Sequence, residues 1–147
     1  MAFPYAKILC PIDFDQNSNK ALEKAAETAR HFKAAIFLLH AVPLTAQFAD
    51  VPLPVDLYRE QQKAALARLN EIAAQKLSGI EHQTAVYIGD VVGSILQAAD
   101  QYKPDLLVLA THGRTGIAHF VLGSVAEAMV RRASCPVLTI RNERPNA

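Results

Sequence analysis

The sequence predicts an α/β fold in which a doubly wound, five-stranded parallel sheet carries helices on both faces. Short apolar runs of strand length alternate along the chain with longer segments whose apolar residues recur at helical spacing. Such alternation requires crossover connections, which produce a parallel sheet covered by helices. The 147 residues suffice for one domain with a substantial core, and no internal repeat competes with that interpretation. We therefore expect a single domain over residues 1–147.

The first two predicted strands flank a helix with one apolar face. Residues 7–13 are apolar until they end in Asp13, and residues 35–42 are apolar on both faces, as in a buried parallel strand. Between them, Asp15 begins a turn-and-cap segment before the helix. The helix is expected to bury Leu22, Ala25, Ala26, Ala29 and Phe32.

A proline-containing segment, residues 43–55, then interrupts the regular pattern. Its three prolines, Pro43, Pro52 and Pro54, predict an ordered loop or lid rather than a linker between domains. A second helix follows over about residues 56–77 and ends at Ser78-Gly79. Its core-facing side chains are expected to be Leu66, Leu69, Ile72, Ala73 and Leu77.

The second half of the chain repeats the alternation. Residues 82–88 form a weaker, more alternating strand that suits a sheet edge, and Asp90 caps the helix after it. A fourth strand, residues 104–109, is apolar from Leu106 onward, and a fifth, residues 136–140, begins with a proline that suits an edge position. The third helix is expected to bury Val92, Ile95, Ala99 and Tyr102.

The segment after the fourth strand is the most informative. Residues 110–116 are glycine-rich, and the chain runs on to Gly123 and Ser124, where a short helix begins. A strand, a glycine-rich loop and a helix N-terminus commonly hold phosphate, because free N–H groups and the helix dipole favour an anion there. The residues leave an alternative open, in which the glycines only turn the chain and Ser124 caps the helix, with Glu127 completing a capping box.

A strand order of 3-2-1-4-5 would bring distant residues together. The order reverses between strands one and four, and open sheets bind ligands in the crevice at such a point. Asp13 ends strand one and the glycine-rich segment follows strand four, so both would meet at one site. The same order separates Cys10 from Cys135 by about 10 Å, too far for a disulfide, so we expect buried structural thiols.

Longer motifs resemble the universal stress protein family. Its ATP-binding members carry G-x-x-G, nine residues, and then G-S or G-T. This chain has Ala110 to Gly113, nine residues from 114 to 122, and then Gly123-Ser124. Ala110 is a departure, because the family has glycine there. The resemblance covers nearly the whole chain and includes residues 8–13, 38–42 and 135–140.

The resemblance implies a Rossmann-like domain that binds ATP with Mg²⁺. It implies that Asp13 and the backbone at Ala41 face the ribose and adenine, and that Gly113, Gly123 and Ser124 line the phosphates. The Asp13 carboxylate could also help to hold a phosphate-bound Mg²⁺. The candidate nucleotide-binding residues are Pro11, Ile12, Asp13, Ala41, Ala110, Thr111, His112, Gly113, Arg114, Gly116, Gly123, Ser124 and Val125.

Composition and motif content argue against other functions. A net charge of +1 disfavours a dedicated nucleic-acid binder, and no apolar run approaches the roughly 20 residues that span a bilayer. The N-terminus shows no export signal, which predicts a cytoplasmic location. An ATP pyrophosphatase or nucleotidyl transferase would need an S-G-G-x-D-S or H-x-G-H motif, and the sequence has neither.

We therefore expect a nucleotide-binding stress regulator with no catalytic residue, capable at most of slow ATP hydrolysis or autophosphorylation. The remaining alternative is a nucleotide-free dimeric scaffold or chaperone-like protein with the same fold. In either case, an edge strand at residues 136–140 leaves unpaired backbone groups, which predicts a homodimer through that edge. The resemblance points to the same edge. Other expected partners are unidentified regulatory proteins, with neither nucleic acid nor membrane among them.

Overall fold

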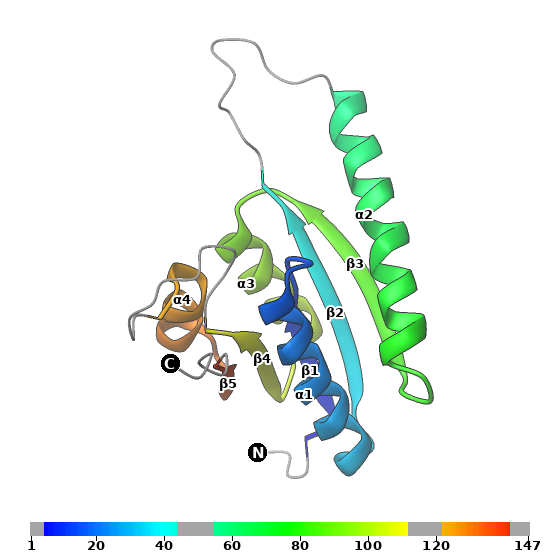
Figure 1. Ribbon diagram of the computed structural model, residues 1–147. Helices are drawn as coiled ribbons and strands as arrows, with labels where there is room; N and C mark the ends of the chain where they lie inside the picture. The colour runs from blue at the N-terminus through cyan, green and yellow to red at the C-terminus, as the bar shows by residue number, and fades with distance from the viewer. Residues whose placement is uncertain (1–4, 44–54, 112–121, 142–147) are drawn as a thin grey trace, which may run out of the picture.

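One five-stranded parallel sheet forms the centre of the molecule (Figure 1). The structure is a computed structural model, which describes residues 5–43, 55–111 and 122–141. The elements in chain order are β1 (Lys7–Pro11), α1 (Gln16–Phe32), β2 (Ala35–Val42), α2 (Val55–Lys76), β3 (His82–Ile88), α3 (Val91–Tyr102), β4 (Leu106–Ala110), α4 (Ser124–Arg132) and β5 (Val137–Ile140). The strand order is β3-β2-β1-β4-β5, so the predicted fold class and order are confirmed.

Most strands lie close to their predicted positions. β2 and β3 occupy the predicted ranges, and β3 and β5 are the two edges. β1 ends at Pro11 rather than Asp13, because the Asp13 N–H donates to the Ser18 hydroxyl of α1 (3.0 Å) instead of to a strand. β5 begins at Val137 because Pro136 has no N–H for the ladder, although its carbonyl still accepts from β4.

Aspartates begin α1 and α3, as predicted. The Asp15 carboxylate accepts from the Ser18 N–H at 2.9 Å, and the Asp90 carboxylate accepts from the Gly93 N–H at 2.7 Å. A cap of this kind stabilises a helix by about 1 kcal/mol, because it satisfies an N–H that has no partner within the helix. Gly79, just after α2, has φ 78°, a left-handed conformation that glycine adopts without strain.

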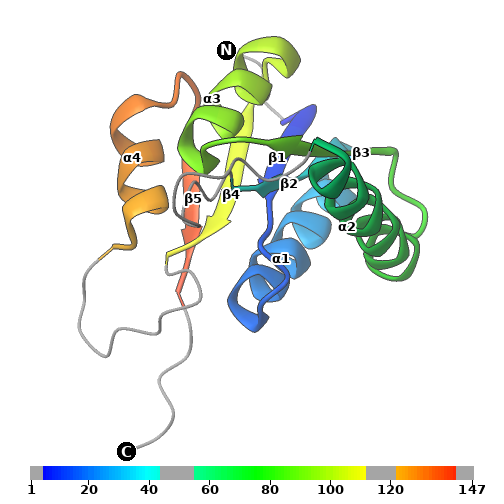
Figure 2. The ribbon, with the colours of Figure 1, turned by 90° about the horizontal axis from the view of Figure 1, so that it is seen from above.

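The helices divide between the two faces of the sheet, α1 and α2 on one and α3 and α4 on the other (Figure 2). Successive strand residues therefore enter different cores: Ile8 and Cys10 face α1 and α2, whereas Leu9 faces α3 and α4. Five side chains predicted to be buried are only partly covered: Phe32, Leu66, Ile72, Val92 and Tyr102.

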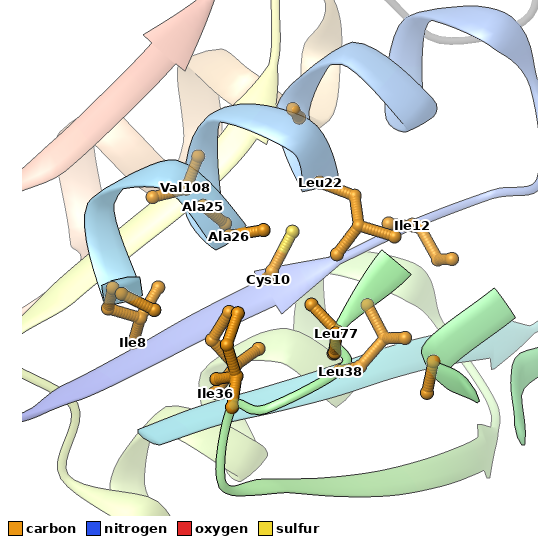
Figure 3. Packing of buried hydrophobic residues seen from close by; sticks show 14 of the residues in the cluster. Ile8, Cys10, Ile12, Leu22, Ala25, Ala26, Ile36, Leu38, Leu77 and Val108 are labelled. Carbon is orange, nitrogen blue, oxygen red and sulfur yellow. The ribbon is translucent and has the colours of Figure 1, made fainter. Parts of the chain in front are cut away.

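The two cysteines are free, as predicted. Figure 3 shows the Cys10 sulfur directed from β1 toward α1, among Leu22, Ala25 and Ala26. Burial there raises the pKa of the Cys10 thiol to about 12, so it stays protonated and acts as a small apolar core residue. Cys135 is only partly buried, because it lies on the connection between α4 and β5 rather than inside a strand.

Two further predictions concern the proline-containing segment and the lack of a membrane-spanning segment. Most of the proline-containing segment, residues 44–54, lies outside the described residues. Among the helices that the structure does describe, none combines the length and apolar character needed to cross a membrane.

Asp105 joins β1 to β4 at the centre of the sheet. Its carboxylate accepts from the N–H groups of Ala6 and Lys7, both at 2.9 Å, and its own N–H donates to the Lys7 carbonyl at 2.8 Å. β4 begins at Leu106, directly after Asp105, rather than at residue 104, and it runs to Ala110 rather than to residue 109. These bonds align two strands that are far apart in the sequence, so that their carboxyl ends emerge side by side.

We propose that two copies of the chain pair through the β5 edge. β4 pairs with one side of β5 and β5 is an edge of the sheet, and two exposed apolar side chains are Leu138 of β5 (38%) and Val130 of α4 (54%). Wild type should scatter light at micromolar concentration as a species of about twice the 16.0 kDa chain mass, and Leu138→Lys should reduce it to the monomer. Val55→Lys, at an exposed valine of α2, should leave the mass unchanged. A monomeric wild type would exclude this interface.

Candidate functional site

The carboxyl ends of β1, β2 and β4 and the N-terminus of α4 surround a pocket of about 480 Å³. It lies where the strand order reverses, and its volume falls within the roughly 300–1,000 Å³ of small-molecule sites. Four candidate residues, His112, Gly113, Arg114 and Gly116, lie outside the described residues. All the other candidates line the pocket: Pro11, Ile12, Asp13, Ala41, Ala110, Thr111, Gly123, Ser124 and Val125.

Ser18 orients the side chain of Asp13, which lies just beyond the carboxyl end of β1. The Ser18 hydroxyl accepts from the Asp13 N–H at 3.0 Å and donates back to the Asp13 carboxylate. The same carboxylate oxygen accepts from the Asp15 N–H at 3.1 Å. Ser18 is buried and lines the pocket, so the Asp13 carboxylate is presented in one orientation.

Asp15 lies in the same turn, and its carboxyl titrates abnormally. Burial raises the pKa of Asp15 above its usual value, and the negative charge of Asp13 acts in the same direction, against the hydrogen bond from the Ser18 N–H. The β1–α1 turn therefore holds two carboxylates close together, one lining the pocket and one capping the helix.

β2 extends beyond β1 at the pocket. The last pair of the β1–β2 register is Pro11 with Leu39, whereas β2 continues to Val42 beside β3. Ala41 directs its N–H and C=O toward the β1 side, as Leu39 does, but the Ile12 carbonyl is bonded by the His40 side chain instead. Within the described residues the Ala41 N–H has no partner, and it faces the pocket.

The N-terminus of α4 presents backbone donors to the same pocket. Gly123 is the N-cap with φ −59°, and no described side chain caps the helix. The capping-box alternative is therefore wrong: Ser124 is the first helical residue, and the Glu127 carboxylate pairs with Arg131 at 3.0 Å. The Gly123 N–H is not one of the donors, because it bonds the Thr111 carbonyl at 2.7 Å. The donors are the N–H groups of residues 124–126, which have no partner within a helix.

The sequence did not predict the apolar side chains that form one wall of the pocket. Val91 and Ile95 reach it from the first turns of α3, and Leu39 and Leu109 reach it from the sheet. Their spacing predicts only a buried face, because periodicity does not distinguish a core from a cavity wall. The missed lining residues are Ser18, Leu39, Val91, Ile95, Leu109, Leu122, Ala126 and Glu127.

The pocket combines three kinds of surface: apolar walls, a carboxylate held in one orientation, and backbone donors at a positive helix end. Such a site suits a ligand with a flat apolar part, hydroxyl groups and an anionic group. Among the described residues there is no group of three or more His, Cys, Asp or Glu side chains that could hold a metal ion.

Comparison with known proteins identifies relatives over nearly the whole chain. A model of the Universal stress protein family matches residues 4–141. Universal stress protein A homolog 2 of Coxiella burnetii is 36% identical over 141 residues, which cover 93% of this chain and 95% of that protein. The structure of a universal stress protein from Lactobacillus plantarum has a TM-score of 0.75 at 27% identity, with 93% of this chain and 98% of that chain covered.

A further solved structure carries a ligand. It is a universal stress protein family member from Arabidopsis thaliana with AMP bound, and its TM-score is 0.65 with 94% of this chain and 92% of that chain covered. At 22% identity, this likeness shows the shared fold alone.

The carboxyl of Asp15 should make stability depend on pH. A raised pKa means that the folded state binds more protons, so this group lowers stability as the pH rises through the ordinary aspartate pKa to the raised one. Asp15→Asn keeps a capping oxygen without the charge, so it should match or exceed wild type in urea unfolding at neutral pH. That difference should disappear at about pH 3, below the ordinary aspartate pKa.

The matched control is Asp15→Ala, which removes the cap and should cost about 1 kcal/mol at neutral pH. An asparagine variant as unstable as the alanine variant would show that the charge of Asp15 is needed.

Proposed function

Because the chain belongs to the universal stress protein family, we propose that its pocket binds an adenine nucleotide, ATP with Mg²⁺ foremost. We further propose that occupancy changes a surface that the protein presents to a second copy or to a regulatory partner. The proposal rests on one observation above all. The residues of β1, β2, β4 and α4 that the family resemblance assigns to nucleotide contact line a single pocket, although they are far apart in the sequence.

The phosphates would lie against α4. Three N–H groups at residues 124–126 and the positive end of the helix dipole favour an anion there. The Ser124 side chain is exposed and makes no capping bond, which leaves its hydroxyl available to a phosphate oxygen. Gly123 lines the same end, and the absence of a side chain keeps that space open.

The base and sugar would lie toward β1 and β2. Adenine carries a donor and an acceptor on one edge, and the N–H and C=O of Ala41 offer the complementary pair. Leu39, Val91 and Ile95 supply apolar contact for the ring. Asp13, oriented by Ser18, would accept from a ribose hydroxyl. A Mg²⁺ ion would be held chiefly by the phosphates, with Asp13 as the nearest candidate carboxylate.

The proposal is tested by titrating adenosine, AMP and ATP, with and without Mg²⁺, into the purified protein in a calorimeter. Gly123→Val is the variant designed to lose nucleotide binding, and wild type is its comparison. Its φ of −59° is open to valine, so the fold should persist, while the added side chain would occupy the phosphate end of the pocket. We expect binding by wild type and at least tenfold weaker AMP and ATP binding by the variant, with adenosine less affected.

Unchanged ATP affinity in Gly123→Val would show that the phosphate end is misplaced. A wild type that releases no nucleotide on denaturation and binds none at millimolar concentration would favour the dimeric scaffold instead.

Ala110, which replaces the first glycine of the family motif, should be compatible with binding. It is the last residue of β4, it is not among the described residues with positive φ, and its methyl group packs against the core under α1 and α2. Ala110→Gly should therefore tighten ATP binding only modestly, by less than about threefold. It should also lower the free energy of unfolding by about 0.5–1 kcal/mol, because glycine in a strand loses more entropy. A glycine variant that binds ATP well beside a non-binding wild type would contradict this expectation.

A further inference from the structure

Phe14 has an unusual backbone conformation next to the pocket. Its φ is 69°, in the left-handed region that bulky side chains seldom adopt, and it stands between Asp13 and the N-cap Asp15. Such a conformation persists only when surrounding contacts hold it. If Phe14 relaxed, the peptide that follows Asp13 would rotate, and the Asp13 carboxylate would move with it.

Two side chains from other elements contact the Phe14 ring. His40 of β2 lies with its ring centroid 4.2 Å from that of Phe14 and the planes tilted by 38°. Arg68 of α2 has its guanidinium carbon 4.4 Å from the centroid of the Phe14 ring. These two contacts, from β2 and from α2, hold the strained residue.

His40 also bonds the pocket backbone directly. Its Nδ1 lies 2.8 Å from the Ile12 carbonyl oxygen, and because a carbonyl only accepts, Nδ1 carries the hydrogen. Ile12 and Asp13 both line the pocket. Of the two side chains on Phe14, His40 is therefore bonded to the pocket lining, whereas Arg68 is a cation on a helix from which no described residue lines the pocket.

We propose that Arg68 is a positioning residue for the ligand: it holds Phe14, and through Phe14 it sets the orientation of the Asp13 carboxylate. This inference rests on the proposed function, because Asp13 is assigned there to the ribose. The link makes the position of α2 one determinant of affinity. Conversely, a ligand that moves Asp13 shifts the contact between Phe14 and Arg68.

The expected effect follows from the strength of the contact. A cation over an aromatic ring at an exposed site contributes an amount that corresponds to about a two- to fivefold change in an equilibrium constant. The effect should be similar for adenosine and AMP, because Asp13 would contact the sugar that both contain. Loss of a distant positive charge would instead weaken the binding of AMP and leave adenosine unchanged.

The experiment compares Arg68→Gln, Arg68→Lys and the control Lys63→Gln. Lys63 is an exposed cation on the same helix, and its replacement removes the same charge. We expect Arg68→Gln to bind adenosine and AMP about two- to fivefold more weakly, and Arg68→Lys to recover most of that loss. In the ligand-free protein, the backbone amide NMR signals of Asp13 and Phe14 should move in Arg68→Gln and stay in place in Lys63→Gln.

Three results would each overturn the inference: unchanged Asp13 and Phe14 signals in Arg68→Gln, a loss confined to AMP, or an equal loss in Lys63→Gln. The amide signals are read without ligand, so they decide the link even if wild type binds no nucleotide, a result that would refute the proposed function alone.

Discussion

Two residue pairs, Ile8 with Leu106 and Leu9 with Leu107, join β1 to β4 at the centre of the sheet. The Asp105 carboxylate supports this short register by accepting from the N–H groups of Ala6 and Lys7. The crevice depends on this pairing of β1 with β4. After β1 the chain enters α1 on one face of the sheet, and after β4 it reaches α4 on the other face. The pairing stops at Leu9 and Leu107, before the carboxyl ends of the two strands, and the pocket opens beside those ends.

Unequal strand lengths complete the site. β2 continues past the end of β1, so Ala41 faces the pocket with backbone groups that a longer β1 would have paired. The N-terminus of α4 likewise contributes N–H groups without a side-chain cap. Much of the polar character of the pocket is therefore main chain, which explains how alanine and glycine can stand at positions that face a ligand.

The β1–α1 turn shows how one short segment serves both the core and the pocket. Asp13 lines the pocket, Phe14 packs against the core under α1 and α2, and Asp15 caps α1. These demands place a bulky residue at a positive φ and two carboxylates within one turn. Strain and an abnormal pKa therefore coincide at the residues beside the pocket.

The sequence by itself determined the alternation of strands and helices and the caps at Asp15 and Asp90, because local periodicity and hydrogen bonding specify these features. The candidate residues at the strand ends came from its resemblance to the universal stress protein family. Only the tertiary structure decided that Gly123 rather than Ser124 caps α4, that Val91 and Ile95 form a pocket wall, and that Arg68 packs on Phe14. Each of these depends on how elements distant in sequence approach one another. A helical pattern states which face is apolar, whereas the packing of the helix on the sheet decides what that face meets.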